Sequence, residues 1–149
     1  MSEATLSRLR LVAECFRDAA YIYLHSTLER TPALSKWSSL ISHPKGQAIA
    51  NLLSRLKTQT ISNNCEFSAL TFPLFIAGSE TNSGDEEDRA FILRTLTTLE
   101  VNFGIGNVKR AKEVLRVLWR ENENENWGLG GRKHWVDVLE RLGWDLNLA

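Results

Sequence analysis

The side chains best able to act as nucleophiles or metal ligands are few in this sequence and widely separated. It contains two cysteines, Cys15 and Cys65, and three histidines, His25, His43 and His134. Structural zinc sites need four thiolate or imidazole ligands at short, regular spacings, and these residues have no such spacing. Two cysteines form at most one bridge, which excludes a small secreted fold held by several disulfides. We therefore expect no metal site and no cofactor.

Two other arrangements could carry chemistry, and each has a plainer structural explanation. The glycine-rich run at 128–131, followed by Arg132 and Lys133, could hold a phosphate group at the start of a helix. This run matches neither the phosphate-loop pattern nor the dinucleotide-binding pattern, and the mismatch favours its interpretation as a flexible turn. The acidic run at 85–88 needs no catalytic explanation, because acids are favoured in the first turn of any helix. No G-x-S-x-G string occurs, and Cys15 lies in an apolar helical row, so the sequence predicts no enzyme.

Charge and hydropathy limit the classes of partner. The chain of 149 residues carries 18 basic and 18 acidic side chains, so its formal net charge is zero. Proteins that grip nucleic-acid backbones usually have a basic excess, and we expect no direct nucleic-acid contact from this segment. The longest apolar stretch, at 72–77, is far shorter than the ~20 residues of a membrane span, and no signal-peptide pattern is visible. We expect a soluble intracellular protein.

The elements that must position these residues are predicted to be helices almost throughout. Between residues 6 and 24, apolar residues recur at steps of three and four in two neighbouring rows. So wide an apolar stripe predicts a helix packed on two neighbours, ending near Arg30 because Pro32 forces Thr31 out of the helical region. The first row is Leu6, Leu9, Ala13, Phe16, Ala20, Tyr23 and Leu24, and the second is Val12, Cys15, Ala19 and Ile22.

Two helices are predicted in the middle of the chain. One begins near Pro44, since proline is tolerated in the first helical turn. The other lies within 70–78, a stretch that is apolar on all sides. Pro73 would remove a ladder hydrogen bond from a central strand, so we predict a buried helix there.

Three more helices are predicted in the last part. The first begins after a capping residue at 83–85 and breaks at Gly104, and the second spans 108–121. A polar and glycine-rich loop at 121–131 then leads to a last helix, which Gly143 closes. Together these elements predict a single domain, residues 1–149, with an all-α fold: about six helices in an irregular orthogonal bundle without a sheet.

The tryptophans leave two interpretations open. Five of them are many for this length, and four follow residue 118. They either pack in the core or form the wall of an apolar ligand pocket or a partner interface.

Several short strings occur in an order and spacing that match a known family. The most specific is L-T-F-P-L-F-I-A-G at 70–78, followed by Glu80. The others are A-A-Y-I-Y-L-H at 19–25, Asp88-Arg89, G-N-V at 106–108, V-L-W at 117–119, Trp127 or Trp135, and Gly143-Trp144. Over about residues 10 to 145 the chain thereby resembles the fungal-specific transcription factor domain, the regulatory domain of fungal zinc binuclear cluster transcription factors.

The chain departs from the family pattern in two ways. Phe72 stands where the family usually has tryptophan, and the chain matches only the C-terminal part of a longer family domain. The six-cysteine zinc cluster and basic linker that bind DNA in such regulators are missing from these residues. We interpret the chain as a fragment, a truncated gene product or a stand-alone descendant that lacks its own DNA-binding cluster.

The resemblance implies a regulatory and interaction module of a fungal transcription factor, located in the nucleus. It also implies protein partners or self-association, and a lipophilic ligand of the kind sensed by sterol-responsive family members. The alternative is a stand-alone helical adaptor or dimerisation decoy that acts without DNA. The candidates for the wall of a ligand pocket are Phe72, Phe75, Phe91, Trp119 and Trp135.

Overall fold

The computed structural model describes residues 1–58, 62–123 and 133–146. Within these ranges there are six α-helices, two short 3-10 helices and no strand, which confirms the all-α fold. The α-helices are α1 (Glu3–Arg30), α2 (Lys45–Thr58), α3 (Thr71–Ser79), α4 (Glu86–Phe103), α5 (Asn107–Glu123) and α6 (Trp135–Leu142). The 3-10 helices are η1 (Ser35–Leu40) and η2 (Cys65–Leu70).

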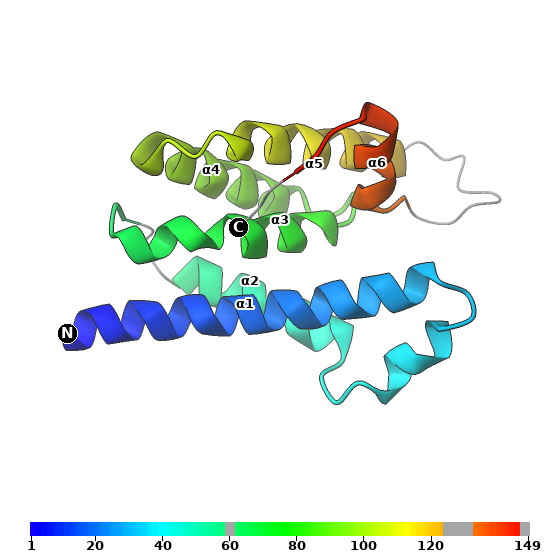
Figure 1. The fold of residues 1–149 in the computed structure, drawn as a ribbon, viewed down its shortest axis with the longest axis horizontal. Coiled ribbons are helices and arrows are strands. Elements are labelled where there is room, and N and C mark those ends of the chain that lie inside the picture. Colours follow the sequence, from blue (N-terminus) through cyan, green and yellow to red (C-terminus); the bar gives the residue numbers. More distant parts are fainter. Residues whose placement is uncertain (59–61, 124–132, 147–149) are drawn as a thin grey trace.

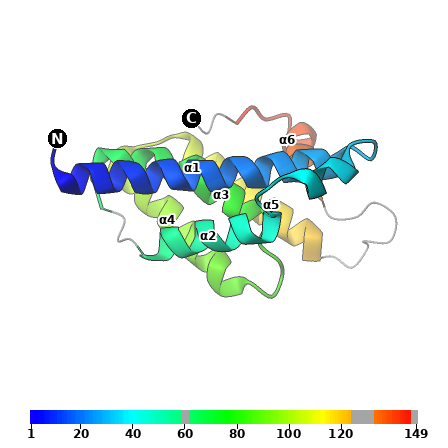
Figure 2. The same ribbon diagram turned by 90° about the horizontal axis from the view of Figure 1, so that it is seen from below.

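The short helix α3 lies at the centre of the arrangement. It packs against α1 and α2 on one side and against α4 and α5 on the other, as Figures 1 and 2 show. The helix α6 crosses the end of α5 (Figure 1). The bundle therefore consists of two helical layers joined through one buried helix.

The sequence of α3 explains its position. Every residue of this helix except Phe72 is buried, as an apolar stretch without a polar face requires. Pro73 lies in its first turn, where the missing N–H costs nothing. A Cβ atom on Gly78 would lie 2.8 Å from Leu115 Cδ1 and 3.3 Å from Ile92 Cγ2, so this glycine lets α3 approach both α4 and α5.

Helix α1 has the predicted length, but its two apolar rows have different environments. The α1 side chains of Cys15, Ala19 and Ile22, which we call the inner row, are buried against the core. Most of the first predicted row is exposed, with Leu6 at 54% and Leu9 at 41%. Helix α1 packs on two neighbouring α-helices, α2 and α3, as predicted, but the bundle contacts this row at only a few positions, such as Phe16 against Phe72. We call Leu6, Leu9, Ala13, Phe16, Ala20, Tyr23 and Leu24 the outer row.

The helix ends follow the expected chemistry. Thr31 is extended at the end of α1, and Gly104 and Gly143 adopt left-handed φ angles of 61° and 65° at the ends of α4 and α6. The Trp144 amide donates to the Leu139 carbonyl, so the chain folds back over the end of α6. Asp85 precedes α4, but its carboxylate accepts from the Asn82 amide and makes no cap bond.

The predicted connecting segments differ from the structure in two places. The 3-10 helices η1 and η2 were not predicted, because their side chains lack a repeating apolar pattern. Helix α5 continues through Glu123, so the first three residues of the loop predicted at 121–131 are helical. The remainder of that loop lies outside the described residues.

Candidate functional site

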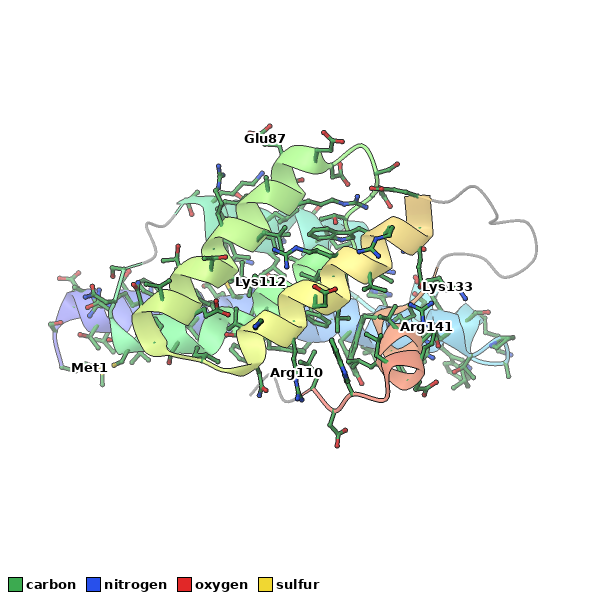
Figure 3. All side chains as sticks on the ribbon, turned by 90° about the horizontal axis from the view of Figure 1, so that it is seen from above. Met1, Glu87, Arg110, Lys112, Lys133 and Arg141 are labelled. Atoms are coloured by element: carbon green, nitrogen blue, oxygen red, sulfur yellow. The ribbon has the colours of Figure 1, made fainter. Side chains whose placement is uncertain are left out.

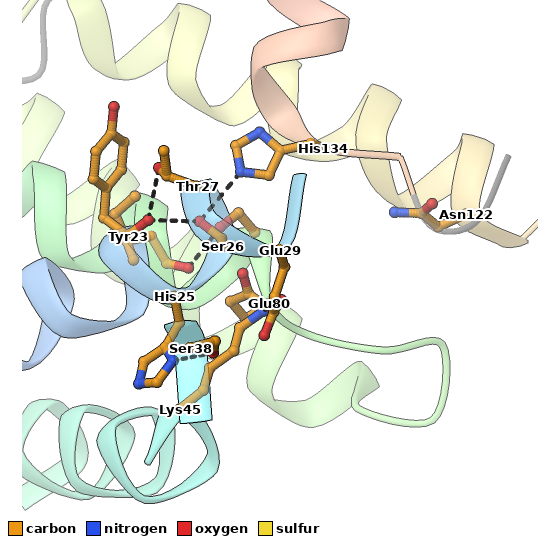
Figure 4. Close-up of polar contacts among 12 residues, drawn as sticks. Tyr23, His25, Ser26, Thr27, Glu29, Ser38, Lys45, Glu80, Asn122 and His134 are labelled. Atoms are coloured by element: carbon orange, nitrogen blue, oxygen red, sulfur yellow. Dashed lines mark hydrogen bonds and ion pairs between the residues drawn. The ribbon is translucent and has the colours of Figure 1, made fainter. Parts of the chain in front are cut away.

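A polar cleft of about 440 Å³ lies where the C-terminal end of α1 meets the ends of three other helices. Its walls come from α1, the start of α2, the end of α3 and the start of α6 (Figure 4). These segments are distant in sequence, so only the folded chain forms the cleft. The lining residues are Ser26, Glu29, Arg30, Lys45, Ser79, Glu80, Lys133, His134, Trp135 and Asp137.

Lys45 links three of the helices that form the cleft. Its Nζ lies 2.8 Å from Glu29 Oε2 of α1 and 3.1 Å from Glu80 Oε2, directly after α3. Lys45 is the first residue of α2 and immediately follows Pro44, near which the helix was predicted to begin. One ammonium group thus neutralises two carboxylates from separate elements.

His134 fixes the start of α6 and also contacts α1. Its Nδ1 accepts from the Val136 amide at 3.2 Å, and the Asp137 carboxylate accepts from the His134 amide at 3.3 Å. This reciprocal pair is a capping box, with histidine in the place usually held by serine or threonine. Nδ1 accepts a hydrogen bond and therefore carries no proton, so the proton is on Nε2, 3.3 Å from the Ser26 hydroxyl.

Further contacts attach α6 to α1. Arg30 Nη2 donates to Asp137 Oδ1 at 2.7 Å, and the Tyr23 and Trp135 rings lie 6.1 Å apart. The lining side chains include Arg30, Lys45 and Lys133 on the basic side and Glu29, Glu80 and Asp137 on the acidic side. Because the two charges balance, and Arg30 and Lys45 already pair with carboxylates of the cleft, the cleft does not select for an ion of one sign.

Phe75 and Trp135 are the two predicted pocket residues that meet. Trp135 lines the polar cleft, and its ring lies edge-on to the fully buried Phe75 ring at 5.3 Å. Phe72 lies elsewhere, against Phe16 of α1 at 5.7 Å.

The other two predicted pocket residues lie in the layer formed by α4 and α5. Phe91 is half-buried, with Lys57 Nζ 5.8 Å from its ring. Trp119 donates from Nε1 to the Gly78 carbonyl at 2.8 Å. The five candidates therefore do not line one common cleft, and an apolar pocket formed by them stays a prediction.

Arg89 is a buried residue whose role the sequence did not reveal. It lies on α4 with its guanidinium 4.9 Å from the Trp119 ring, and its Nε donates to Thr81 Oγ1 at 3.2 Å. It also pairs with Glu123 near the end of α5. Asp88-Arg89 was part of the family resemblance, but nothing in the string indicated burial. Arg89 connects the end of α3, α4 and α5.

Lys112 makes a second polar link in the same layer (Figure 3). Its Nζ donates to Thr97 Oγ1 at 3.1 Å and pairs with Glu100 at 3.4 Å, which ties α5 to α4.

The remaining histidine and cysteine candidates have structural environments. His25 Nε2 donates to the His43 carbonyl at 2.7 Å, and its Nδ1 lies 2.6 Å from the Ser38 hydroxyl, so it holds the segment after α1. Burial raises the pKa of the Cys15 thiol from 9.0 to about 11, which keeps this group neutral and unreactive. Cys65 is exposed.

One carboxylate near Cys65 is held in its charged form. A backbone hydrogen bond at Glu66, and then a hydrogen bond from the Arg8 guanidinium at 3.2 Å, lower the pKa of the Glu66 carboxyl. The pair connects α1 to η2, which is a structural role.

In the part of the chain that the structure describes, no three histidine, cysteine or acidic side chains come together as a metal site. No helix among those residues is both long enough and apolar enough to cross a membrane.

Comparison with known proteins gives one family and one relative. The family described as "Fungal specific transcription factor domain" matches residues 1–149. An uncharacterized transcriptional regulatory protein of Schizosaccharomyces pombe is 26% identical over 132 residues, which cover 89% of this chain and 22% of the relative. The chain thus spans about a fifth of that relative's length. No solved structure matches the chain.

Proposed function

The chain belongs to the fungal-specific transcription factor domain family, and from this membership we propose that it is a regulatory module of a fungal transcription factor. The observation that carries the proposal is the family match, which extends over all 149 residues. The family is one of transcription factor regulatory domains and not of enzymes. The S. pombe relative, named as a transcriptional regulatory protein, supports the same role.

The proposal places the regulatory effect in protein contacts and not in DNA contacts. The balanced charge of 18 basic and 18 acidic side chains supports an effect through protein contacts, because binding to DNA phosphates usually requires a basic excess. DNA binding would then come from a separate cysteine cluster, and the module would act in the nucleus.

A tethering experiment tests the proposal. The chain is fused to a heterologous DNA-binding domain, and transcription of a reporter with the matching operator is measured in yeast. We expect the fusion to change reporter transcription relative to the DNA-binding domain alone. A Leu74→Ala fusion, which loses a fully buried side chain, should lose the effect. A folded nuclear fusion that leaves the reporter unchanged would contradict the proposal.

Ligand sensing is a finer form of the proposal. An apolar ligand would enter beside Phe75 and Trp135, the two aromatic candidates in contact, with Phe72, Phe91 and Trp119 as the remaining candidates. Native mass spectrometry of the protein purified from a fungal host should then show a bound lipophilic molecule. A protein that carries no such molecule and whose melting temperature is unchanged by added sterols would exclude this form.

The second candidate is a helical adaptor or dimerisation decoy that acts without DNA. The exposed outer row of α1 favours it, because apolar side chains gathered on one face promote association. An active adaptor would bind partners while its tethered fusion leaves the reporter unchanged. Light scattering then separates the adaptor from the decoy, since of the two only the decoy would form a dimer with itself.

A further inference from the structure

The outer row of α1 has the spacing of a coiled-coil seam. Six of its residues, at positions 6, 9, 13, 16, 20 and 23, alternate steps of three and four without interruption. This is a heptad pattern, in which positions a and d lie along one side of a helix and pack against another helix. Single exposed apolar side chains are common on protein surfaces and need no explanation. An apolar heptad pattern that continues over most of a helix does need one.

Most of this seam faces outward. The a positions Leu6, Ala13 and Ala20 are all exposed, and so is the d position Leu9. The other two d positions touch the bundle, since Phe16 contacts Phe72 of α3 and Tyr23 contacts Trp135 of α6. The outer row therefore lies at the edge of the bundle. Phe16 and Tyr23 on one side of the seam contact the bundle, and the a positions on the other side remain available to a partner.

The charges beside the seam indicate what would cover it. The e positions on its open side hold Glu3, Arg10, Arg17 and Leu24, all exposed, whereas the g positions Val12 and Ala19 turn toward the core. Arg17 Nε lies 3.8 Å from Asp18, but Asp18 itself is buried and bonded to Arg55 of α2. Two guanidinium groups thus border most of the exposed seam, and one carboxylate, that of Glu3, borders it only where α1 begins.

A second copy of the chain does not complement this border. In an antiparallel pair of fully overlapping α1 helices the e positions face each other, which sets Arg10 of one copy against Arg17 of the other and leaves Glu3 facing Leu24. In a parallel pair the e positions face g positions, and Val12 and Ala19 offer no carboxylate. A helix with carboxylates beside its own apolar seam matches both the apolar row and the arginines.

We propose that the outer row of α1 docks an amphipathic helix of a partner protein, with leucine or isoleucine along its seam and glutamate or aspartate beside it. This inference rests on the proposed regulatory function, for which it names the class of partner. Leu9 and its neighbours supply the apolar contact, and Arg10 and Arg17 select the acidic flank.

The test uses the purified 149-residue chain and two synthetic peptides. Both have about four heptads with leucine at a and d, one with glutamate and the other with lysine at e and g. Fluorescence anisotropy should show that the acidic peptide binds at least about tenfold more tightly than the basic peptide, with a difference that falls as salt rises. The doubly substituted R10E/R17E protein should reverse the preference.

Two further variants separate docking from folding. Leu9→Glu should abolish binding of the acidic peptide while leaving the circular dichroism spectrum and the melting temperature unchanged, because Leu9 is exposed. Val101→Glu, on α4 and 76% exposed, should leave binding unchanged as the matched control.

Three outcomes would overturn the inference: no binding, equal binding of both peptides, or a homodimer that Leu9→Glu dissociates. Because peptide binding is measured without a reporter, its failure is distinguishable from failure of the regulatory proposal.

Discussion

Helix α3 and the outer row of α1 are both strongly apolar in sequence, yet they lie in opposite environments. Leu74 and Phe75 of α3 are fully buried between two helical layers. Leu6 and Leu24 of the outer row are 54% and 44% exposed. The same side-chain types therefore stabilise the fold in one region and remain available to a partner in the other.

The difference follows from geometry and not from hydropathy. Helix α3 is apolar around its whole circumference, and such a helix is stable only where neighbours cover every side. Helix α1 has two apolar rows, and the bundle buries the inner one but contacts the outer one only at positions such as Phe16 and Tyr23. An apolar row thus predicts a contact, but the partner in that contact need not belong to the same part of the chain.

The largest expected effect comes from shortening a side chain in α3. Leu74→Ala should lower the free energy of unfolding by about 3 kcal/mol, because the buried leucine loses its contacts and leaves a cavity. Urea unfolding followed by circular dichroism measures the change. A loss below about 1 kcal/mol would contradict the central position of α3, since only collapse of the surroundings gives so small a cost.

Arg89 tests whether the layer of α4 and α5 also depends on a buried polar contact. Arg89→Ala should lower the free energy of unfolding by about 2 kcal/mol, because Thr81 loses its donor and the Trp119 ring loses its cation. The exposed Arg94 of the same helix gives the matched control, and Arg94→Ala should have little effect. Equal effects of the two substitutions in urea unfolding would show that the Arg89 contacts contribute nothing.

Cys15 tests the inner row through pH. Its pKa is raised by burial from 9.0 to about 11, so the folded protein holds the thiol proton more tightly than the unfolded chain does. Its contribution to stability is therefore complete below about pH 9 and is lost as the pH rises to about 11. We expect a loss on the order of 1 kcal/mol, because local opening relieves part of the cost of a buried thiolate.

Cys15→Ala is the control that isolates this loss from other groups that titrate at high pH. The difference in urea midpoint between the wild-type and Cys15→Ala proteins should change between pH 9 and pH 11. A constant difference across that window would show that the thiol ionises equally well in the folded protein.

The smallest effect is expected in the outer row. Leu9→Ala, the same substitution as in α3, should change the free energy of unfolding by less than about 0.5 kcal/mol, because the side chain is 41% exposed. Urea unfolding of the two leucine variants side by side measures the contrast. Similar losses in both would remove the distinction between the two regions.

Much of the fold could be predicted from local signals along the chain. Apolar spacing located the six helices, Pro32 placed the end of α1, and Gly104 and Gly143 marked helix ends because left-handed φ angles favour glycine. Pro73 correctly favoured a helix over a central strand in α3. These features depend on neighbouring residues alone.

The features that were missed depend on contacts between distant residues. Periodicity could not decide which row of α1 faces the core, since both rows have helical spacing. The burial of Arg89 depends on Thr81 and Glu123, and the cleft depends on Lys45 and His134 meeting α1. One signal for the start of α6 was present in the sequence. Position 134 holds a residue able to accept a cap bond, and Asp137 follows three positions later, but histidine is not the usual residue in that motif.

The length of α1 gives the molecule a mechanical property. Its 28 residues span about 42 Å at 1.5 Å per residue. Near one end Arg8 binds Glu66 of η2, and at the other end Arg30 binds Asp137 of α6. One continuous helix paired in this way at both ends acts as a spacer that holds η2 and α6 at a set separation on opposite ends of the bundle.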